Sequence, residues 1–261
     1  MDFNFKKSLG QNFLQDKNIL ANIVKVSNIK NNSLVIEIGP RSGNLTKEIA
    51  NVANQVLCYE IDKRLESILD KELLEYNNID IIYDDFLNRD IKKDIENYKY
   101  NNLYLVANLP YYITTPIIEK VINSNLPFNQ LTIMIQKEVG ERFNAKPKTK
   151  SYNSLTVYLN YYFDIKSEFI VSRNAFLPKP NVDSIVISLI KKDNLLYLKD
   201  KDLFNKLLRD SFKFKRKTIK NNLNNYDLKI IEEILQKYGF SLTSRAEELP
   251  LEVFVEIANS L

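Results

Sequence analysis

The sequence predicts an α/β protein in which a mostly parallel sheet is followed by a small all-helical domain. Two observations predict this fold class. Short apolar runs alternate with amphipathic segments as far as Ile135, which is the pattern of successive βαβ units. After Lys191 the apolar residues instead recur with the period of a helix. We therefore expect a sheet domain at residues 1–190 and a helical domain at residues 191–261.

The individual elements follow from these runs. Strands of the parallel sheet are expected at residues 34–38, 56–61, 79–83, 103–107 and 131–135. Helices are expected between them, at residues 45–53, 63–75, 91–98 and 116–123. Three further β-rich runs are expected to extend the sheet, at residues 154–163, 168–171 and 184–190. The helical domain shows helix-period segments at residues 203–223, 228–238 and 251–258.

The composition excludes several kinds of chemistry. The 261 residues contain no histidine, so histidine bases, histidine metal clusters and Ser-His-Asp machinery are absent, and we expect no metal site. The single cysteine, Cys58, cannot form an intramolecular disulfide and fits a reducing compartment. No apolar stretch is long enough for a membrane span, and the first residues lack the apolar core of a signal peptide. A cytoplasmic protein without a membrane partner is the expectation.

Positive charge is concentrated in one region. The net charge is +4, yet residues 191–220 hold eleven Lys and Arg against four Asp and Glu. Residues 212–220 interleave aromatic and cationic side chains, a pattern that suits phosphate contacts and base stacking. The alternative is a lysine-rich, solvated helix face with Phe212 and Ile219 in the core, and for Lys213 the two interpretations are equally good. The candidate RNA-binding residues are Lys213, Lys215, Arg216, Lys217 and Lys220.

The tetrapeptide Asn108-Leu109-Pro110-Tyr111 follows the fourth expected strand directly. Its position is the carboxyl end of a strand, where open α/β sheets bind ligands. The proline favours a turn that presents the Asn108 side-chain oxygen and a neighbouring carbonyl as two convergent acceptors, with Tyr111 as a stacking ring. Such a set suits the exocyclic amine of a base, and holding both amine hydrogens aims the nitrogen lone pair at an electrophile. The alternative is a plain strand-exit turn.

The ends of the first three strands predict a nucleoside-binding site. The first strand runs into a glycine turn at Gly39, and Glu60 ends the second strand about twenty residues later, where a carboxylate meets ribose hydroxyls. The dinucleotide fingerprint is broken by Arg41 and Asn44, which disfavours a nicotinamide cofactor and favours S-adenosylmethionine. Asp85, after the third strand, could accept from the adenine amine while Phe86 contacts the ring. Solvated strand-end carboxylates are the alternative for Glu60 and Asp85.

Taken together, these motifs resemble those of the rRNA adenine N6-dimethyltransferases, specifically the small-subunit dimethyladenosine transferases linked to kasugamycin sensitivity. The resemblance spans nearly the whole chain and rests on several motifs in the same order. Beside residues 108–111, they are found at residues 8–14, 37–40, 59–62, 136–139, 176–184, 215–218 and 245–247, with Asp85 between them.

The resemblance implies a Rossmann-like S-adenosylmethionine-dependent methyltransferase sheet and an assignment for each site residue. The cofactor pocket would be formed by Asn12, Leu14, Gly39, Glu60, Asp85 and Asn108. Asn108, Leu109, Pro110 and Tyr111 would hold the target adenosine, and Phe176 would close over its other face. The implied reaction dimethylates N6 of two adjacent adenosines in the loop of the 3′-terminal hairpin of small-subunit rRNA. The implied substrate is a pre-assembled small ribosomal subunit, and the enzyme would be a monomer with a role in subunit biogenesis.

The chain departs from the family pattern at two positions. The family has glycine where this chain has Arg41, whose side chain either points outward or pairs with the cofactor carboxylate. Tyr112 replaces an asparagine just past the tetrapeptide. Three other functions stay open: a large-subunit rRNA methyltransferase of the macrolide-resistance type, an assembly checkpoint protein with dispensable catalysis, and a mitochondrial transcription factor derived from the family.

Overall fold

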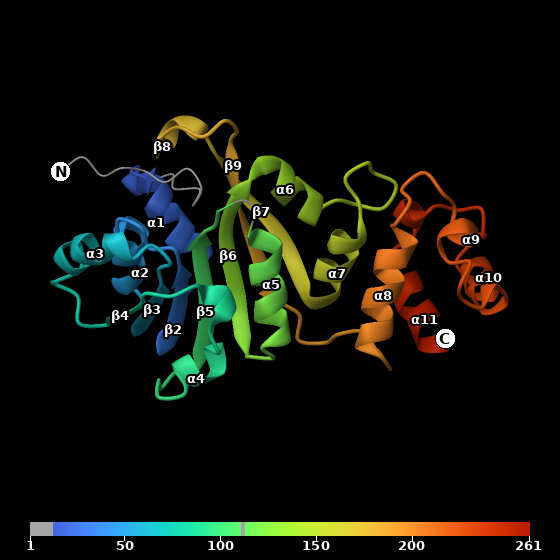
Figure 1. The fold of residues 1–261 in the computed structure, drawn as a ribbon, viewed down its shortest axis with the longest axis horizontal. Helices are drawn as coiled ribbons and strands as arrows, with labels where there is room; N and C mark the ends of the chain where they lie inside the picture. Colours follow the sequence, from blue (N-terminus) through green and yellow to red (C-terminus); the bar gives the residue numbers. More distant parts are fainter. Residues whose placement is uncertain (1–12, 111–112) are drawn as a thin grey trace. The chain divides into compact units, whose positions relative to one another are not determined.

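A seven-stranded sheet is the largest element of the computed structural model, which describes residues 13–110 and 113–261 (Figure 1). The strand order is β4-β3-β2-β5-β6-β9-β7. The first five strands in this order, from β4 through β3, β2 and β5 to β6, pair in parallel. Strand β9 pairs antiparallel with β6. The strands are β2 (Ser33–Ile38), β3 (Gln55–Tyr59), β4 (Ile79–Ile82), β5 (Asn102–Asn108), β6 (Phe128–Gln136), β7 (Phe163–Val171) and β9 (Ser184–Lys191). The predicted α/β class and its five parallel strands are confirmed.

Helices cover the sheet because its central strands are apolar on both faces. All six residues of β2 are buried, as expected for a central parallel strand. On one face, Ile23 and Ile49 from two helices pack with Val35 and Val56 of the sheet. The helices of this part are α1 (Lys17–Val26), α2 (Asn44–Ala50), α3 (Glu66–Glu72), α4 (Ile91–Ile95), α5 (Thr114–Asn123) and α6 (Lys137–Phe143).

The register of the parallel strands gathers their carboxyl ends at one edge. Ile38, the last residue of β2, is paired with Tyr59 on one side and with Ala107 on the other. The residues that follow these three positions therefore leave the sheet together. All three of these residues, Gly39, Glu60 and Asn108, are predicted site residues.

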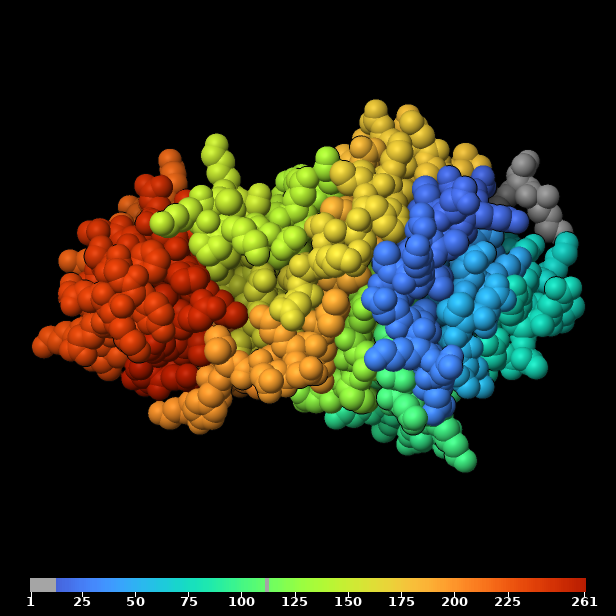
Figure 2. Space-filling view, turned by 180° about the vertical axis from the view of Figure 1, so that it is seen from behind, coloured from blue at the N-terminus to red at the C-terminus, as the bar shows by residue number. Residues whose placement is uncertain are grey.

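A short two-stranded sheet lies apart from the large one. It pairs β1 (Phe13–Leu14) antiparallel with β8 (Phe176–Leu177), so that Leu14 is opposite Phe176. Both side chains belong to the hydrophobic cluster that contains α1. Figure 2 shows α1, in blue, beside the yellow segment that carries β7 and β8.

The prediction of a strand at residues 154–163 is wrong, because this segment forms helix α7 (Ser154–Tyr162). Its many β-branched and aromatic residues favour a strand, but a capping box overrides this preference. The Asn153 side chain accepts from the Thr156 backbone, while the Thr156 hydroxyl accepts from the Asn153 backbone. The helix then buries Val157 and Tyr161 in a helical core.

The basic segment is also less helical than its pattern predicts. Helix α8 (Lys201–Ser211) ends before the basic segment, and α9 (Ile219–Asn222) begins after it. The Asn222 side chain explains the break: its amide donates to the Ser211 carbonyl, at 2.7 Å, and its oxygen accepts from the Phe214 backbone N–H. Residues 212–218 therefore form a loop, whereas Phe212 and Ile219 pack into the core.

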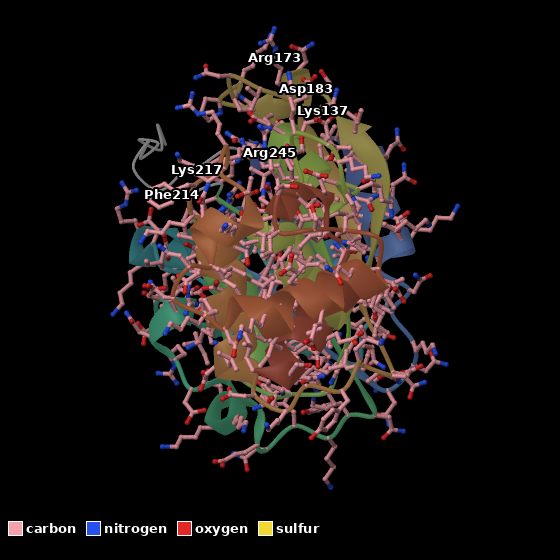
Figure 3. The ribbon with its side chains drawn as sticks, turned by 90° about the vertical axis from the view of Figure 1, so that its right-hand side faces the viewer. Lys137, Arg173, Asp183, Phe214, Lys217 and Arg245 are labelled. Atoms are coloured by element: carbon pink, nitrogen blue, oxygen red, sulfur yellow. The ribbon has the colours of Figure 1, made fainter. Side chains whose placement is uncertain are left out.

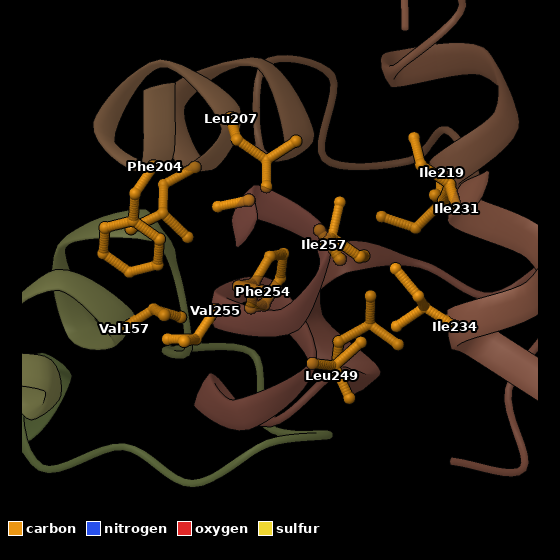
Figure 4. Packing of buried hydrophobic residues seen from close by; sticks show 14 of the residues in the cluster. Val157, Phe204, Leu207, Ile219, Ile231, Ile234, Leu249, Phe254, Val255 and Ile257 are labelled. Carbon is orange, nitrogen blue, oxygen red and sulfur yellow. The ribbon is translucent and has the colours of Figure 1, made fainter. Parts of the chain in front are cut away.

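The chain divides into two compact units, and the second one is discontinuous. The first comprises the residues up to Gly140 together with Lys166–Lys191, and the second comprises Glu141–Ile165 together with Lys192–Leu261. The expected division at residue 190 placed α7 in the sheet domain, whereas its core contacts place it with α8, α10 (Leu228–Lys237) and α11 (Leu251–Ser260). Figure 4 shows this core, where Val157 packs near Phe204 and Val255. Among the described residues, no helix is both long and apolar enough to cross a bilayer.

Candidate functional site

The loop between β2 and α2 has an unusual backbone. Gly39, Arg41 and Gly43 have φ angles of +74°, +57° and +76°, all in the left-handed region. Glycine adopts such angles without steric cost, whereas arginine does not. The Gly39 N–H donates to the Tyr59 carbonyl, which ties the start of the loop to the end of β3. The predicted glycine turn is therefore present, but it contains one strained, non-glycine residue.

Glu60 is the carboxylate that organises this loop. Its Oε2 accepts from the Arg41 backbone N–H at 3.1 Å, and its Oε1 accepts from the Asp62 N–H at 2.9 Å. Its side chain is buried, and this burial raises the pKa of Glu60. Each carboxylate oxygen can still accept a further hydrogen bond. The interpretation of Glu60 as a plain solvated carboxylate is therefore wrong.

A cavity at this edge of the sheet brings together most of the predicted nucleoside-binding residues. Apolar side chains form much of its wall, with carboxylates at the strand ends. Asp85 caps the 3-10 helix η3 (Phe86–Asn88) by accepting from the Leu87 N–H, so it has a structural role as well. The residues that line the cavity are Ile38, Gly39, Arg41, Tyr59, Glu60, Ile61, Asp84, Asp85, Phe86, Leu87, Pro110, Ile113 and Ile117.

A second, smaller cavity adjoins the first, and Gly39 and Arg41 line both. It contains Leu14 and Asn108, two further predicted site residues, together with Glu37 and Asn44. The Asn44 side chain donates to the Leu14 carbonyl at 3.3 Å, which fixes β1 against the start of α2. Phe176 does not line either cavity within the described part of the chain. Only 5% of its surface is exposed, and it is packed in the core beside Leu14.

Backbone hydrogen bonds hold the Asn108 turn at the end of β5. Leu109 is buried, and its N–H donates to the Met134 carbonyl at 3.1 Å, so the turn is held on β6. The Pro110 carbonyl accepts from the Ile113 N–H. Within the described residues, the Asn108 side chain forms no hydrogen bond, and the Leu109 carbonyl has no backbone donor. Both oxygens can therefore accept further hydrogen bonds.

Three residues that the sequence singles out, Asn12, Tyr111 and Tyr112, lie outside the described residues.

The sequence left open whether the Arg41 side chain points into the site or away from it. Its side chain is 7% exposed, and its Nη2 donates to the Asn108 carbonyl at 3.0 Å. The left-handed backbone at residue 41 and the hydrogen bond to Asn108 accompany this direction, and no motif signals it. No cluster of three or more potential metal ligands is found in the part of the chain that the structure describes.

Glu37 should make the stability of the protein depend on pH. It is fully buried beside the Cys58 thiol, and burial raises its pKa from 4.5 to about 7. Because the folded protein holds this proton more tightly than the unfolded chain, the contribution of Glu37 to the free energy of unfolding is greatest below pH 4.5 and falls as the pH rises to about 7. The fall amounts to about 3 kcal/mol at 1.4 kcal/mol per pKa unit.

Urea unfolding of the wild type and of Glu37→Gln on either side of this pH window measures the effect. As the pH rises, the free energy of unfolding of the wild type should fall relative to that of Glu37→Gln. The exposed Glu96→Gln is the matched control and should show no such shift. A parallel pH response in the wild type and Glu37→Gln would contradict the prediction.

Comparison with known proteins agrees with this geometry. The model of a family described as ribosomal RNA adenine dimethylase matches residues 2–261. The chain belongs to this family. It is 43% identical to the ribosomal RNA small subunit methyltransferase A of Oceanobacillus iheyensis, over 99% of this chain and 90% of that protein. Membership of the ribosomal RNA adenine dimethylase family confirms the resemblance seen in the motifs and identifies the chain as an rRNA adenine dimethyltransferase.

Solved structures of similar fold support the same family. A dimethyladenosine transferase from Plasmodium falciparum superimposes with a TM-score of 0.80 at 28% identity, covering 94% of this chain and 95% of that one. The 23S rRNA methyltransferase ErmE superimposes with a TM-score of 0.74 at 25% identity, covering 96% of this chain and 99% of that one. The Rossmann-like methyltransferase sheet is thereby confirmed.

Proposed function

We propose that this dimethylase transfers methyl groups from S-adenosylmethionine to N6 of two adjacent adenosines in the loop of the 3′-terminal hairpin of small-subunit rRNA. The observation that carries this proposal is the common edge where Glu60 and Asn108 leave neighbouring strands. It brings the Glu60 carboxylate and the Asn108 side-chain amide into adjoining cavities. The 43% identity to a small-subunit methyltransferase favours the small subunit.

The donor set fits S-adenosylmethionine, which supplies an electrophilic methyl group on its sulfonium when bound. Glu60 would accept from the ribose hydroxyls, and Asp85 would accept from the adenine amine. Phe86 and Ile61 would provide the apolar walls for the ring, since both line the same cavity. Gly39 leaves room for close approach, because a Cβ there would meet nothing nearer than the Arg41 Nε at 4.0 Å. Asn12 and Leu14 are proposed to close the pocket from the N-terminal side.

The acceptor amine would be held by the Asn108 Oδ1 and the Leu109 carbonyl. The Pro110 carbonyl already accepts from the Ile113 N–H, which favours Leu109 as the second acceptor. With both hydrogens held, the N6 lone pair points away from the base and toward the methyl group, so positioning replaces a strong base. The proton that becomes acidic after alkylation leaves to water. Tyr111 and Phe176 are proposed to stack on the base, which for the buried Phe176 requires its ring to become accessible.

The loop at residues 212–218 is the proposed RNA-binding surface. All five residues from Lys213 to Lys217 are exposed, and the Lys213 Nζ lies 5.5 Å from the centre of the Phe214 ring. Figure 3 labels Phe214 and Lys217 on this loop. Lys215 is partly engaged, because its Nζ donates to the Lys150 carbonyl at 2.6 Å. Arg216, Lys217 and the exposed Lys220 are therefore the strongest candidates for phosphate contacts.

Reversing two of these charges should weaken the salt dependence of RNA binding. The double variant Arg216→Glu/Lys217→Glu is expected to reduce the slope of log affinity against log salt by about 1.5, since each lost phosphate contact removes roughly 0.7–0.9. Filter binding to a hairpin from the 3′ end of small-subunit rRNA, over a salt series, measures the slope. Lys201→Glu/Lys229→Glu changes two exposed lysines of the same unit and serves as the charge-matched control. Equal slopes for the two variants would exclude the loop from the interface.

The proposed substrate is a pre-assembled small ribosomal subunit in the cytoplasm, bound by a single copy of the enzyme. A target adenosine in a loop can be turned into the pocket at lower cost than one in a duplex. The test is methyl transfer from labelled S-adenosylmethionine to small subunits that lack the modification, followed by primer extension across the 3′-terminal hairpin. The expected result is two adjacent stops in the hairpin loop. Labelling of large-subunit rRNA alone would instead favour the reaction named for ErmE.

A further inference from the structure

Arg41 occupies the centre of the site in a backbone conformation that opposes a side chain. Its φ is +57°, between two glycines with similar angles. Its cationic side chain is nevertheless buried. A buried charge and a left-handed backbone are both unfavourable unless other interactions compensate for them. The position therefore calls for a role that glycine could not fill.

The contacts of Arg41 connect its own loop, after β2, with the ends of β3 and β5. Its backbone N–H donates to Glu60 at the end of β3, and its guanidinium donates to the Asn108 carbonyl at the end of β5. Its positive charge lowers the pKa of both Glu37 and Glu60 against the effect of their burial. The side chain thus lies where the two cavities meet, because it lines both.

Arg41 supplies the positive charge of the second cavity. Among its described lining residues, Glu37 is the ionisable acid and Arg41 is the cation. If Glu60 and Asp85 hold the nucleoside in the first cavity, the amino-acid end of the donor must extend toward the second. If residue 41 were glycine, the carboxylate of that end would enter a cavity without a cation among its described lining residues.

We infer that Arg41 binds the carboxylate of the amino-acid end of S-adenosylmethionine, an assignment that rests on the donor proposed above. A guanidinium can hold a carboxylate through two parallel N–H donors, which a lysine ammonium cannot do. The Arg41 side chain also contacts the Asn108 carbonyl at the end of β5. It would therefore lie between the carboxylate of the donor and the residue proposed to hold the target amine. Arg41 is therefore a determinant of donor specificity.

Calorimetric titration with two ligands tests the assignment. S-adenosylmethionine and its decarboxylated form share the nucleoside, the sulfonium and the amine, and differ in the carboxylate. Arg41→Gly should weaken the affinity for S-adenosylmethionine by about 10- to 100-fold, the effect of losing a charge-assisted pair. Its affinity for the decarboxylated ligand should stay within about 2-fold of the wild type, because no carboxylate is present to lose. Arg41→Lys should give an intermediate loss for S-adenosylmethionine.

The variants allow folding to be separated from binding. Glycine suits the left-handed backbone at residue 41, so thermal unfolding of Arg41→Gly should show no loss of stability. Lys148→Gly is the matched control, since Lys148 is an exposed cation with a φ of +67° in the other unit. It should bind both ligands as the wild type does.

Two results would overturn the assignment. If Arg41→Gly bound S-adenosylmethionine as tightly as the wild type or more tightly, Arg41 would be an obstruction that the donor displaces. If Arg41→Gly lost affinity equally for both ligands, Arg41 would shape the cavity without recognising the carboxylate. Failure of the wild type to bind S-adenosylmethionine at all would reject the donor itself, which is a separate failure of the proposed function.

Discussion

Replacing Asn108 with alanine is expected to lower the rate of methyl transfer to rRNA by about 100-fold or more, because the proposed mechanism depends on positioning of the target amine. The substitution removes one of the two oxygens that would hold the N6 hydrogens. It keeps the backbone carbonyl that accepts from Arg41, so the cavity should retain its shape. The affinity for S-adenosylmethionine, measured by calorimetry, should therefore stay within about 3-fold of the wild type.

The matched control for this prediction lies on the same strand. Asn102 begins β5 at the opposite edge of the sheet, where its side chain donates to the Asn31 carbonyl. Asn102→Ala removes the same side-chain amide from the same strand and should leave the methyl-transfer rate unchanged. If Asn108→Ala methylated small subunits at nearly the wild-type rate while binding the donor normally, Asn108 would not hold the target amine.

Replacing Glu60 with alanine is expected to abolish most of the donor binding. Hydrogen bonds from ribose hydroxyls to a buried carboxylate should contribute about 3 kcal/mol, so the affinity for S-adenosylmethionine should fall by about 100-fold. The Arg41 and Asp62 backbone N–H groups would also lose their acceptor. This second loss should lower the free energy of unfolding by about 1–3 kcal/mol.

Binding and stability can be measured separately to divide these effects. Calorimetry with S-adenosylmethionine reports the first effect, and urea unfolding without ligand reports the second. Glu66→Ala, at an exposed position on α3 close in sequence, is the control for both. A Glu60→Ala protein that is destabilised but binds the donor with unchanged affinity would limit Glu60 to a structural role.

The strand-end residues could be predicted because their positions follow from local patterns. Glu60 and Asn108 each come directly after an apolar run, and parallel strands bring such residues to one edge. The helix at residues 154–162 could not be predicted from strand propensity, because a capping box and burial in a helical core decided its conformation. The direction of Arg41 was equally hidden. It depends on a backbone angle that the surrounding contacts impose, whereas the motif predicts a glycine.

The discontinuous second unit limits how this protein can be recombined with others. The chain passes between the units after Gly140, after Ile165 and after Lys191. A segment transferred from Lys192 onward would leave behind Tyr152, Val157 and Tyr161, which all belong to its core. A single crossover in the gene cannot therefore exchange the helical unit for a unit of another protein. Substrate preference in this chain should diversify by substitution within the unit rather than by replacement of the unit.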